Sequence, residues 1–233
     1  MSQSPPFGVG LTTDRGNSLL TPPDAGLAGT EHWGHGGMAT RLFDVVFSLV
    51  AVFMLLPVWL LIAVAIKLDD GGPVFYCHER IGRYGRRFRL RKLRTMRVGS
   101  DRHWAPMVRD YSGRALFFKV RDDPRVTRVG WFLRRFSLDE TPQFLDVLAG
   151  KMSVVGPRPH VAAEVAEYEP GQLRRLSVKP GITGLWQVSG RSELSAEEGM
   201  ALDLRYVDSR SFPTDLHIVA RTAKAVVTGK GAW

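Results

Sequence analysis

Two neighbouring acids, Asp139 and Glu140, stand between Arg134 and Arg158 in the run RRFSLDETPQFLDVLAGKMSVVGPRP. A carboxylate is a nucleophile only in its ionised form, and nearby cations favour that form. The same cations would stabilise a negatively charged leaving group. The pair therefore suits covalent catalysis, in which a side chain splits one difficult step into two easier ones. Asp139 and Glu140 are the candidate catalytic residues.

The two acids also fit a purely structural role at the start of a helix. Ser137 and Glu140 have the S-x-x-E spacing of a capping box. The residue before a proline avoids the helical conformation, so Thr141 could instead be the N-cap, with Pro142 at the first helical position. Each reading places the acids at or just before a helix N-terminus. From the residues alone, capping and catalysis both stay open.

An uncharged, apolar segment precedes this region. Residues 45–66 carry no charge and lie between Arg41 and Lys67. A helix of this length reaches about 33 Å, close to the roughly 30 Å of a bilayer core. Pro57 lies near the middle and removes one backbone donor, which predicts a bend. The bend fits either a kinked span or a hairpin that enters and leaves by one face, and the basic residues after Lys67 predict a cytoplasmic C-terminal body in both cases.

The remaining pattern predicts an α/β domain that is mostly helical, with a small β-hairpin. Two strand-like runs, 74–81 and 86–92, flank a turn at 82–85. Apolar spacing predicts helices near 125–136, 138–149, 161–177 and 213–228, with Gly150 as a C-cap. Residues 179–193 read as a glycine-punctuated loop, and residues 98–123 show little pattern.

The charge balance indicates an anionic partner. The net charge is +9 and the pI is near 10.1, and nine basic residues fall between Arg80 and Arg97. Directly after a membrane segment, such a run favours anionic lipid or substrate phosphate over nucleic acid. The single cysteine, Cys77, excludes an intrachain disulfide. Residues 1–37 lack apolar periodicity and predict a disordered tail, in which His32 and His35 make a poor metal site because no further ligand lies nearby.

Several motifs in a fixed order make the chain resemble the bacterial sugar transferases, the monotopic phosphoglycosyl transferases that start glycan assembly on polyprenol phosphate. The motifs follow the apolar segment and are GGPVFY with ERIG, KLRTM, DPRVTRVG, SLDETPQ, MSVVGPRP, KPGITGLWQVSGR and the terminal GKGA. The short length and the wording DGGPVFY are most similar to members that begin exopolysaccharide synthesis. One apolar segment is too little for the membrane body of the multi-span phosphoglycosyl transferases.

The resemblance implies a two-step reaction. Asp139 matches the family's nucleophile, which attacks a UDP-sugar, releases UMP and holds the phosphosugar until polyprenol (undecaprenyl) phosphate accepts it. Glu140 matches the second acid, implicated with Asp139 in binding Mg²⁺ or in handling the acceptor's proton. The expected phosphate-binding cations are Arg134 and Arg158, with Lys92, Arg94 and Arg191 behind them.

The family also implies a re-entrant helix broken at a Ser-Pro pair, whereas this chain has Leu56-Pro57. The expected domains are a tail at 1–37, a re-entrant membrane helix at 38–68 and a cytoplasmic catalytic domain at 69–233, on the bacterial inner membrane. The sugar is not specified, galactose and glucose being the first candidates, and the oligomeric state is open, a homodimer included. The alternative function is a non-catalytic, membrane-tethered basic scaffold that binds anionic lipid or nucleic acid.

Overall fold

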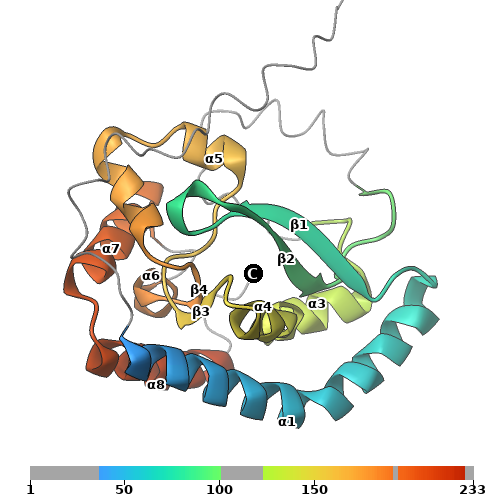
Figure 1. The fold of residues 1–233 in the computed structure, drawn as a ribbon. Coiled ribbons are helices and arrows are strands. Elements are labelled where there is room, and N and C mark those ends of the chain that lie inside the picture. Colours follow the sequence, from blue (N-terminus) through green and yellow to red (C-terminus); the bar gives the residue numbers. More distant parts are fainter. Residues whose placement is uncertain (1–36, 101–122, 191–193, 229–233) are drawn as a thin grey trace, which may run out of the picture.

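The computed structural model describes residues 37–100, 123–190 and 194–228 (Figure 1). Its α-helices are α1 (Met38–Asp70), α3 (Arg128–Arg135), α4 (Phe144–Leu148), α5 (Ala162–Ala166), α6 (Leu185–Ser189), α7 (Ala196–Ser209) and α8 (Phe212–Thr228). The strands are β1 (Phe75–Ile81), β2 (Arg87–Leu93), β3 (Ser153–Val155) and β4 (Gly181–Thr183), and the 3₁₀ turns are η1 (Arg83–Gly85), η3 (Leu138–Gln143) and η4 (Pro170–Ser177). The predicted tail, except Gly37, lies outside the described residues, as do His32, His35 and Arg191.

Helix α1 exposes its apolar side chains and buries a partly polar stripe. Thr40, Asp44 and Ser48 face the protein in its first half, whereas Trp59 and Ile62 do so in its second half. The exposed side chains are Leu42, Val46, Leu49, Val50, Phe53, Met54, Leu56, Leu60, Leu61, Val64 and Leu68. This distribution is the reverse of that on a surface helix in water. By length and composition, α1 is apolar enough to cross a membrane, with a mean hydropathy of 2.9 in its most apolar window.

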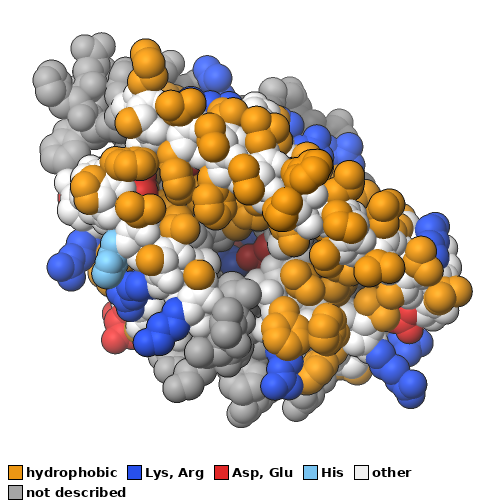
Figure 2. Space-filling view, turned by 90° about the horizontal axis from the view of Figure 1, so that it is seen from below, with side chains coloured by type: hydrophobic (Ala, Val, Ile, Leu, Met, Phe, Trp, Pro, Cys, Tyr) orange, Lys and Arg blue, Asp and Glu red, His pale blue; other side chains and the backbone are white. Residues whose placement is uncertain are grey.

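The predicted long helix is confirmed, and it runs to Asp70 rather than to residue 68. Pro57 lies inside it, and Figure 1 shows that α1 (blue to cyan) bends along its course, its second half rising toward β1. Figure 2 views the face that α1 forms and shows apolar side chains over most of it. Trp131 and Phe132 of α3 and Leu216 of α8 are further exposed apolar side chains.

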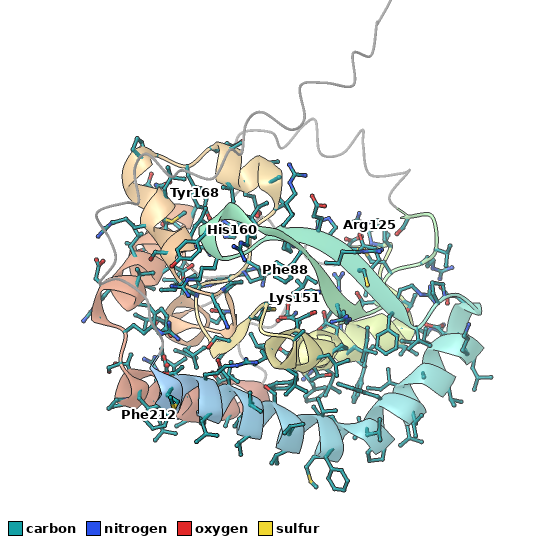
Figure 3. All side chains as sticks on the ribbon, in the orientation of Figure 1. Phe88, Arg125, Lys151, His160, Tyr168 and Phe212 are labelled. Atoms are coloured by element: carbon teal, nitrogen blue, oxygen red, sulfur yellow. The ribbon has the colours of Figure 1, made fainter. Side chains whose placement is uncertain are left out.

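The predicted hairpin is confirmed: β1 and β2 pair antiparallel, with Phe75 opposite Leu93 and Ile81 opposite Arg87. Phe88 and Leu90 on β2 are buried in one hydrophobic cluster with Val147 of α4, and Figure 3 shows Phe88 inside the protein. Successive side chains of a strand point to opposite faces, so Lys92 shares the inward face of Phe88 and Leu90. A lysine at this inward position needs an acidic partner.

A second sheet, made by the parallel pair β3 and β4, was not predicted because each strand has only three residues. The backbones next to it touch: a Cβ on Gly181 would lie 2.0 Å from the Gly156 nitrogen, and one on Gly156 would lie 2.5 Å from the Lys179 oxygen. Only glycine fits at these two positions. The contact fixes the course of the loop after β3, which carries Arg158.

Several sequence-based elements need correction. The predicted helix at 161–177 is two pieces, α5 and η4, because Pro170 begins η4 and the residue before it, Glu169, is extended. The predicted loop at 179–193 contains β4 and α6, and helix α7 was missed. The helix near 138–149 begins as the 3₁₀ turn η3 and ends at Ala149 as its C-cap, with Gly150 following at φ +76°. Helices α3 and α8 are confirmed.

Candidate active site

Asp139 and Glu140 lie in the 3₁₀ turn η3, between α3 and α4. Ser137, just before the turn, has φ +54°, a left-handed conformation that is costly for a residue with a side chain. This conformation reverses the chain after α3 and directs η3 toward β2, against which it packs. Asp139 is 8% exposed. The pair is therefore held on a short, constrained turn.

Neither of the two capping schemes forms at this turn. Ser137 makes no side-chain cap hydrogen bond. The Thr141 hydroxyl donates to the Leu138 carbonyl oxygen at 2.7 Å and accepts from Trp59 Nε1 of α1 at 2.8 Å, so it does not cap either. Both capping predictions are wrong, although the acids do lie in the first turn of η3. Thr141 links the turn to the apolar helix instead.

Lys92 is the cation closest to the two acids among the ion pairs of the described residues. Its Nζ lies 2.6 Å from Glu140 Oε1 and 3.9 Å from Asp139 Oδ2. The Glu140 carboxylate is therefore engaged by Lys92. From the sequence, Lys92 ranks below Arg134 and Arg158 among the expected phosphate-binding cations. In the structure, Lys92 lies within 3.9 Å of both acids.

Arg158 comes to the same place from the loop after β3. Its Nη1 lies 3.8 Å from Glu140 Oε1. Arg80, at the end of β1, faces Arg158: burial lowers the pKa of the Arg80 guanidinium, and the charge of Arg158 lowers it further. Two guanidinium groups and the Lys92 ammonium thus crowd one site. Like charges brought together in this way favour the binding of an anion between them.

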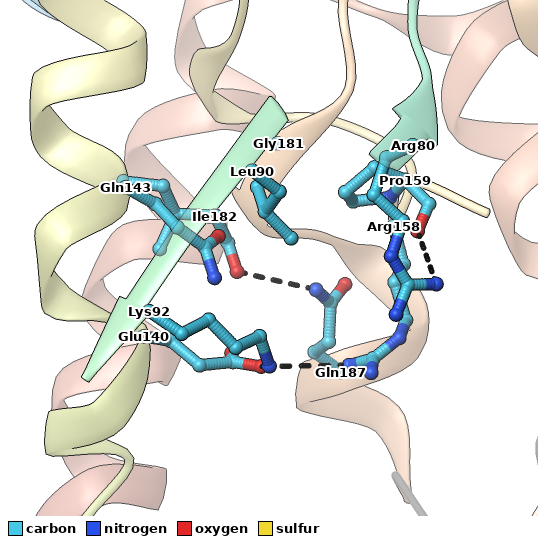
Figure 4. A pocket seen from close by; sticks show the side chains of 10 residues that line it. All are labelled: Arg80, Leu90, Lys92, Glu140, Gln143, Arg158, Pro159, Gly181, Ile182 and Gln187. Atoms are coloured by element: carbon cyan, nitrogen blue, oxygen red, sulfur yellow. Dashed lines mark hydrogen bonds and ion pairs between the residues drawn. The ribbon is translucent and has the colours of Figure 1, made fainter. Parts of the chain in front are cut away.

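These groups line an open pocket of about 270 Å³ (Figure 4). Arg80, Lys92, Glu140 and Arg158 give it charge, and Gln143 and Gln187 give it amide groups; the other lining residues are Leu90, Pro159, Gly181 and Ile182. Asp139 does not line the pocket, but it lies next to Lys92, which does. Figure 4 shows Lys92 and Glu140 on one side of the pocket and Arg80 and Arg158 on the other.

Arg134 approaches the acids from the last turn of α3. Its Nε donates to the Thr95 hydroxyl at 3.0 Å. Burial lowers the pKa of the Arg134 guanidinium, whereas the charge of Asp139 raises it. Arg134 therefore belongs to the electrostatic surroundings of the Asp139–Glu140 dyad, as the sequence suggested.

Arg94 lies elsewhere. Its guanidinium pairs with both oxygens of Asp70 at the end of α1, and its Nε donates to the Pro73 carbonyl oxygen at 2.5 Å. The structure therefore joins Arg94 to the end of helix α1 rather than to Asp139 and Glu140. The other sequence-predicted cation, Arg191, lies outside the described residues.

Three polar pocket residues, Arg80, Gln143 and Gln187, were not singled out from the sequence. Arg80 belonged to the basic run, but nothing distinguished it from its neighbours. Among the described residues, five of the nine cations in that run pair with acidic side chains, namely Arg80, Arg87, Arg91, Lys92 and Arg94. Gln143 and Gln187 are uncharged, and their positions depend on how η3 and α6 pack. The one readable signal was the alternation along β2 that turns Lys92 inward.

Comparison with known proteins decides the family. The profile of the family described as "Bacterial sugar transferase" matches residues 36–229. The chain belongs to this family. The exopolysaccharide production protein ExoY of Rhizobium meliloti (strain 1021) is 44% identical over 202 residues, which are 85% of this chain and 89% of that protein. The resemblance inferred from the motifs is confirmed, and the protein is an enzyme, a phosphoglycosyl transferase.

Two longer relatives carry more specific names. The undecaprenyl-phosphate galactose phosphotransferase of Salmonella typhimurium (strain LT2) is 40% identical over 198 residues, 83% of this chain and 41% of that protein. The UDP-glucose:undecaprenyl-phosphate glucose-1-phosphate transferase of Escherichia coli (strain K12) is 38% identical over 208 residues, 86% of this chain and 42% of that protein. This sugar transferase thus spans less than half the length of these two relatives.

Proposed function

We propose that this protein transfers a sugar-1-phosphate from a UDP-sugar to polyprenol phosphate and so starts the assembly of an exopolysaccharide or another glycan. The names of the relatives support this reaction class. The observation that carries it here is a pocket lined by Glu140, Lys92, Arg80 and Arg158, with Asp139 Oδ2 3.9 Å from the Lys92 ammonium. A diphosphate substrate and a carboxylate nucleophile repel each other, and these cations reduce that repulsion.

The first half-reaction is an attack by a carboxylate oxygen of Asp139 on the β-phosphorus of the UDP-sugar. The new bond is an acyl phosphate, the bond from the β-phosphorus to the bridging oxygen breaks, and UMP leaves with that oxygen. In the second half-reaction, a phosphate oxygen of the polyprenol phosphate attacks the same phosphorus. The Asp139 carboxylate is regenerated, and the product is a polyprenyl diphosphate sugar. Holding the intermediate on the enzyme lets two substrates react in turn at one site.

Each pocket cation has a distinct task in this scheme. Lys92 lies within reach of both acids and keeps Asp139 ionised at the moment of attack. Arg158 and Arg80 lie together on the side of the pocket opposite Lys92 and Glu140, so they stabilise the charge that develops on the leaving UMP. Arg134, next to Asp139, favours the ionised carboxylate from the other side.

The residues present fit Mg²⁺ bound together with the substrate. Mg²⁺ is usually held by one or two protein carboxylates plus substrate phosphates, with water completing the shell. Asp139 and Glu140 supply two carboxylates, and among the described residues no group of three His, Cys, Asp or Glu could hold a metal without substrate. When bound, the ion would neutralise the charge of the reacting diphosphate. Glu140, whose carboxylate is held by Lys92, is the residue to share that ion or to take the acceptor's proton.

The position of the apolar face supports a monotopic membrane enzyme. Arg41, at the start of α1, donates to the carbonyl oxygens of Val147 and Leu148, and Asp70, at its end, binds Arg94. Both ends of α1 are thus fixed to the same globular body. A straight span would instead separate them by the thickness of the bilayer. We expect α1 to enter and leave by the cytoplasmic face of the inner membrane, with its exposed apolar side chains in lipid.

The nucleophile is tested by a burst experiment with the full chain in membranes or detergent. With UDP-galactose or UDP-glucose and Mg²⁺ but no acceptor, we expect about one UMP per active site, and a phosphosugar mass on the peptide that holds Asp139. Asp139→Asn should remove both signals, because a carboxamide is a far poorer nucleophile. A matched control is Asp123→Asn, which changes an acid outside the dyad. Adduct formation by Asp139→Asn, or product only when both substrates are present together, would refute the covalent scheme.

A further inference from the structure

A buried ion pair that the scheme above does not use joins η4 to α7. Arg175 is 3% exposed and Asp203 is fully buried. The Arg175 Nε and Nη2 donate to Asp203 Oδ2 at 2.8 and 2.6 Å. Burial raises the pKa of the Asp203 carboxyl, and the charges of Arg175 and Arg158 oppose that rise. Neither residue lines the pocket.

The remaining donors of Arg175 hold the loop that carries Arg158. Its Nη2 donates to the carbonyl oxygen of Arg158 itself at 2.5 Å. Its Nη1 donates to the Tyr168 hydroxyl at 2.6 Å, and that hydroxyl lies 2.7 Å from His160 Nδ1 (Figure 3). Burial lowers the pKa of His160 far below its usual range, so the ring is neutral. The Tyr168 hydroxyl therefore links Arg175 to the His160 ring.

The same loop is held at further backbone points. The His160 carbonyl oxygen accepts from the Ile81 nitrogen at 2.9 Å, and the Gly156 nitrogen donates to the Thr183 oxygen at 2.8 Å. At the centre of this loop, the Arg158 side chain reaches Glu140. Arg175 is therefore the link between a buried acid on α7 and the backbone of a cation in the pocket.

A fully buried ion pair is weak evidence for stability, because the cost of removing two charges from water offsets much of their attraction. An arginine fork does, however, fix direction, since its planar donors bind several acceptors at set angles. Here one guanidinium binds a carboxylate, a phenol and a backbone carbonyl at once. Leucine or methionine could fill the same space but could not hold the Arg158 carbonyl oxygen.

We propose that Arg175, oriented by Asp203, is a positioning residue that holds the Arg158 loop at the distance needed to grip the substrate diphosphate. The proposal rests on the proposed function, because it assigns Arg158 to the phosphate. Phosphate binding by Arg158 then depends on residues outside the pocket, in the contact between η4 and α7. Substitutions in that contact should alter catalysis through Arg158.

The neighbouring residue supplies a matched control for the test. Arg174 pairs with Asp208, again between η4 and α7, but this pair is exposed, with a distance of 2.9 Å. Arg175→Lys keeps the charge and loses the fork, and it should lower kcat/KM for UMP release by about 10- to 100-fold, the range for a small misplacement of a positioning group. Arg174→Lys should stay within about twofold of wild type. Equal losses in the two variants would overturn the proposal.

A double substitution separates positioning from general destabilisation. If Arg175 acts through Arg158, adding Arg175→Lys to an Arg158→Ala background should cost less than about twofold. The same loss in both backgrounds would overturn the proposal. If Arg175→Lys does not fold, Tyr168→Phe is tested instead, because it removes one hydroxyl and keeps the ion pair. A loss of about threefold in kcat/KM that vanishes in the Arg158→Ala background supports positioning. An unchanged kcat/KM overturns the proposal. Absence of UMP release by wild type would instead refute the proposed function.

Discussion

The substitution Asp70→Asn tests whether Arg94 anchors helix α1 or binds substrate phosphate. The Arg94 guanidinium has five N–H donors. Two of them bind Asp70, one binds the Pro73 carbonyl oxygen, and one binds the Met96 carbonyl oxygen at 3.3 Å. Within the part of the chain that the structure describes, these contacts leave one donor, which is too few for a bidentate contact with phosphate. Gly72 packs against the same group, since a Cβ there would lie 2.7 Å from Arg94 Nη2.

The expected effect on stability follows from the burial of the pair. Arg94 is 7% exposed and the Asp70 side chain is 21% exposed. Exposed ion pairs contribute about 0.2–1 kcal/mol, whereas breaking a fully buried pair costs about 3–5 kcal/mol. For this intermediate case we expect Asp70→Asn to lower the free energy of unfolding by about 1–3 kcal/mol. For a chain of this size, that corresponds to a melting temperature lower by roughly 2–12 °C.

The assay compares melting temperature with UDP affinity. Asp70→Asn and Arg94→Lys should lower the melting temperature alike, and the double variant should be no worse than the poorer single one. Glu79→Gln, which breaks an exposed pair with Arg87, should change it by less than about 2 °C. The Kd for UDP should stay within about twofold in all of them. A tenfold rise in that Kd for Arg94→Lys, without one for Asp70→Asn, would refute the anchor and restore Arg94 as a phosphate ligand.

Three further outcomes are expected. Burial lowers the pKa of His160, so below about pH 6.5 the unfolded chain binds a proton that the folded chain does not. Between pH 7.5 and 5.5, the free energy of unfolding of wild type should therefore fall by about 1.4 kcal/mol more than that of His160→Gln. The control His217→Gln, which changes an exposed histidine, should behave like wild type. UMP release should stop in excess chelator, return with Mg²⁺ and fall by orders of magnitude in Glu140→Gln; undiminished turnover in chelator would contradict a metal role. Cysteines placed at Ser4 and Ala232, in a background without the native cysteine, should both be protected from an impermeant reagent in intact cells, whereas labelling at Ser4 alone would indicate a span.

One motif shows what the sequence could and could not predict. S-x-x-E occurs at Ser137–Glu140 and again at Ser195–Glu198. At the second place it forms a capping box: the Ser195 nitrogen donates to Glu198 at 2.8 Å, and Ser195 Oγ accepts from the Glu198 nitrogen. At the first place Lys92 holds the glutamate. The deciding partner lies 48 residues away, so local spacing alone could not separate a cap from a candidate catalytic acid.

The same contrast explains the other successes and failures. The long apolar helix and the hairpin follow from composition and alternation over many residues, which are local signals. The strands β3 and β4 have three residues each and exist because two glycines let their backbones touch. Arg94 and Lys92 lie two residues apart on one basic run, yet one binds the end of α1 and the other binds the dyad. Which acid each cation pairs with depends on tertiary packing, and the number of charges in the run cannot predict it.

Helix α1, whose apolar side chains are exposed, is linked to the candidate active site by hydrogen bonds to the globular body. The family's Ser-Pro break is Leu56-Pro57 here, so no serine hydroxyl supports the bend. Instead, Asp44 accepts from the Ser153 hydroxyl at 2.9 Å and from the Val154 nitrogen at 2.8 Å, and Trp59 donates to Thr141 in the turn that holds Asp139. These bonds are made to the globular body and not within the helix. Docking therefore supports the bend of this Pro57-containing helix. In the proposed reaction, we expect the same contacts to set the height of the Asp139 carboxylate above the lipid, where the polyprenol phosphate meets it.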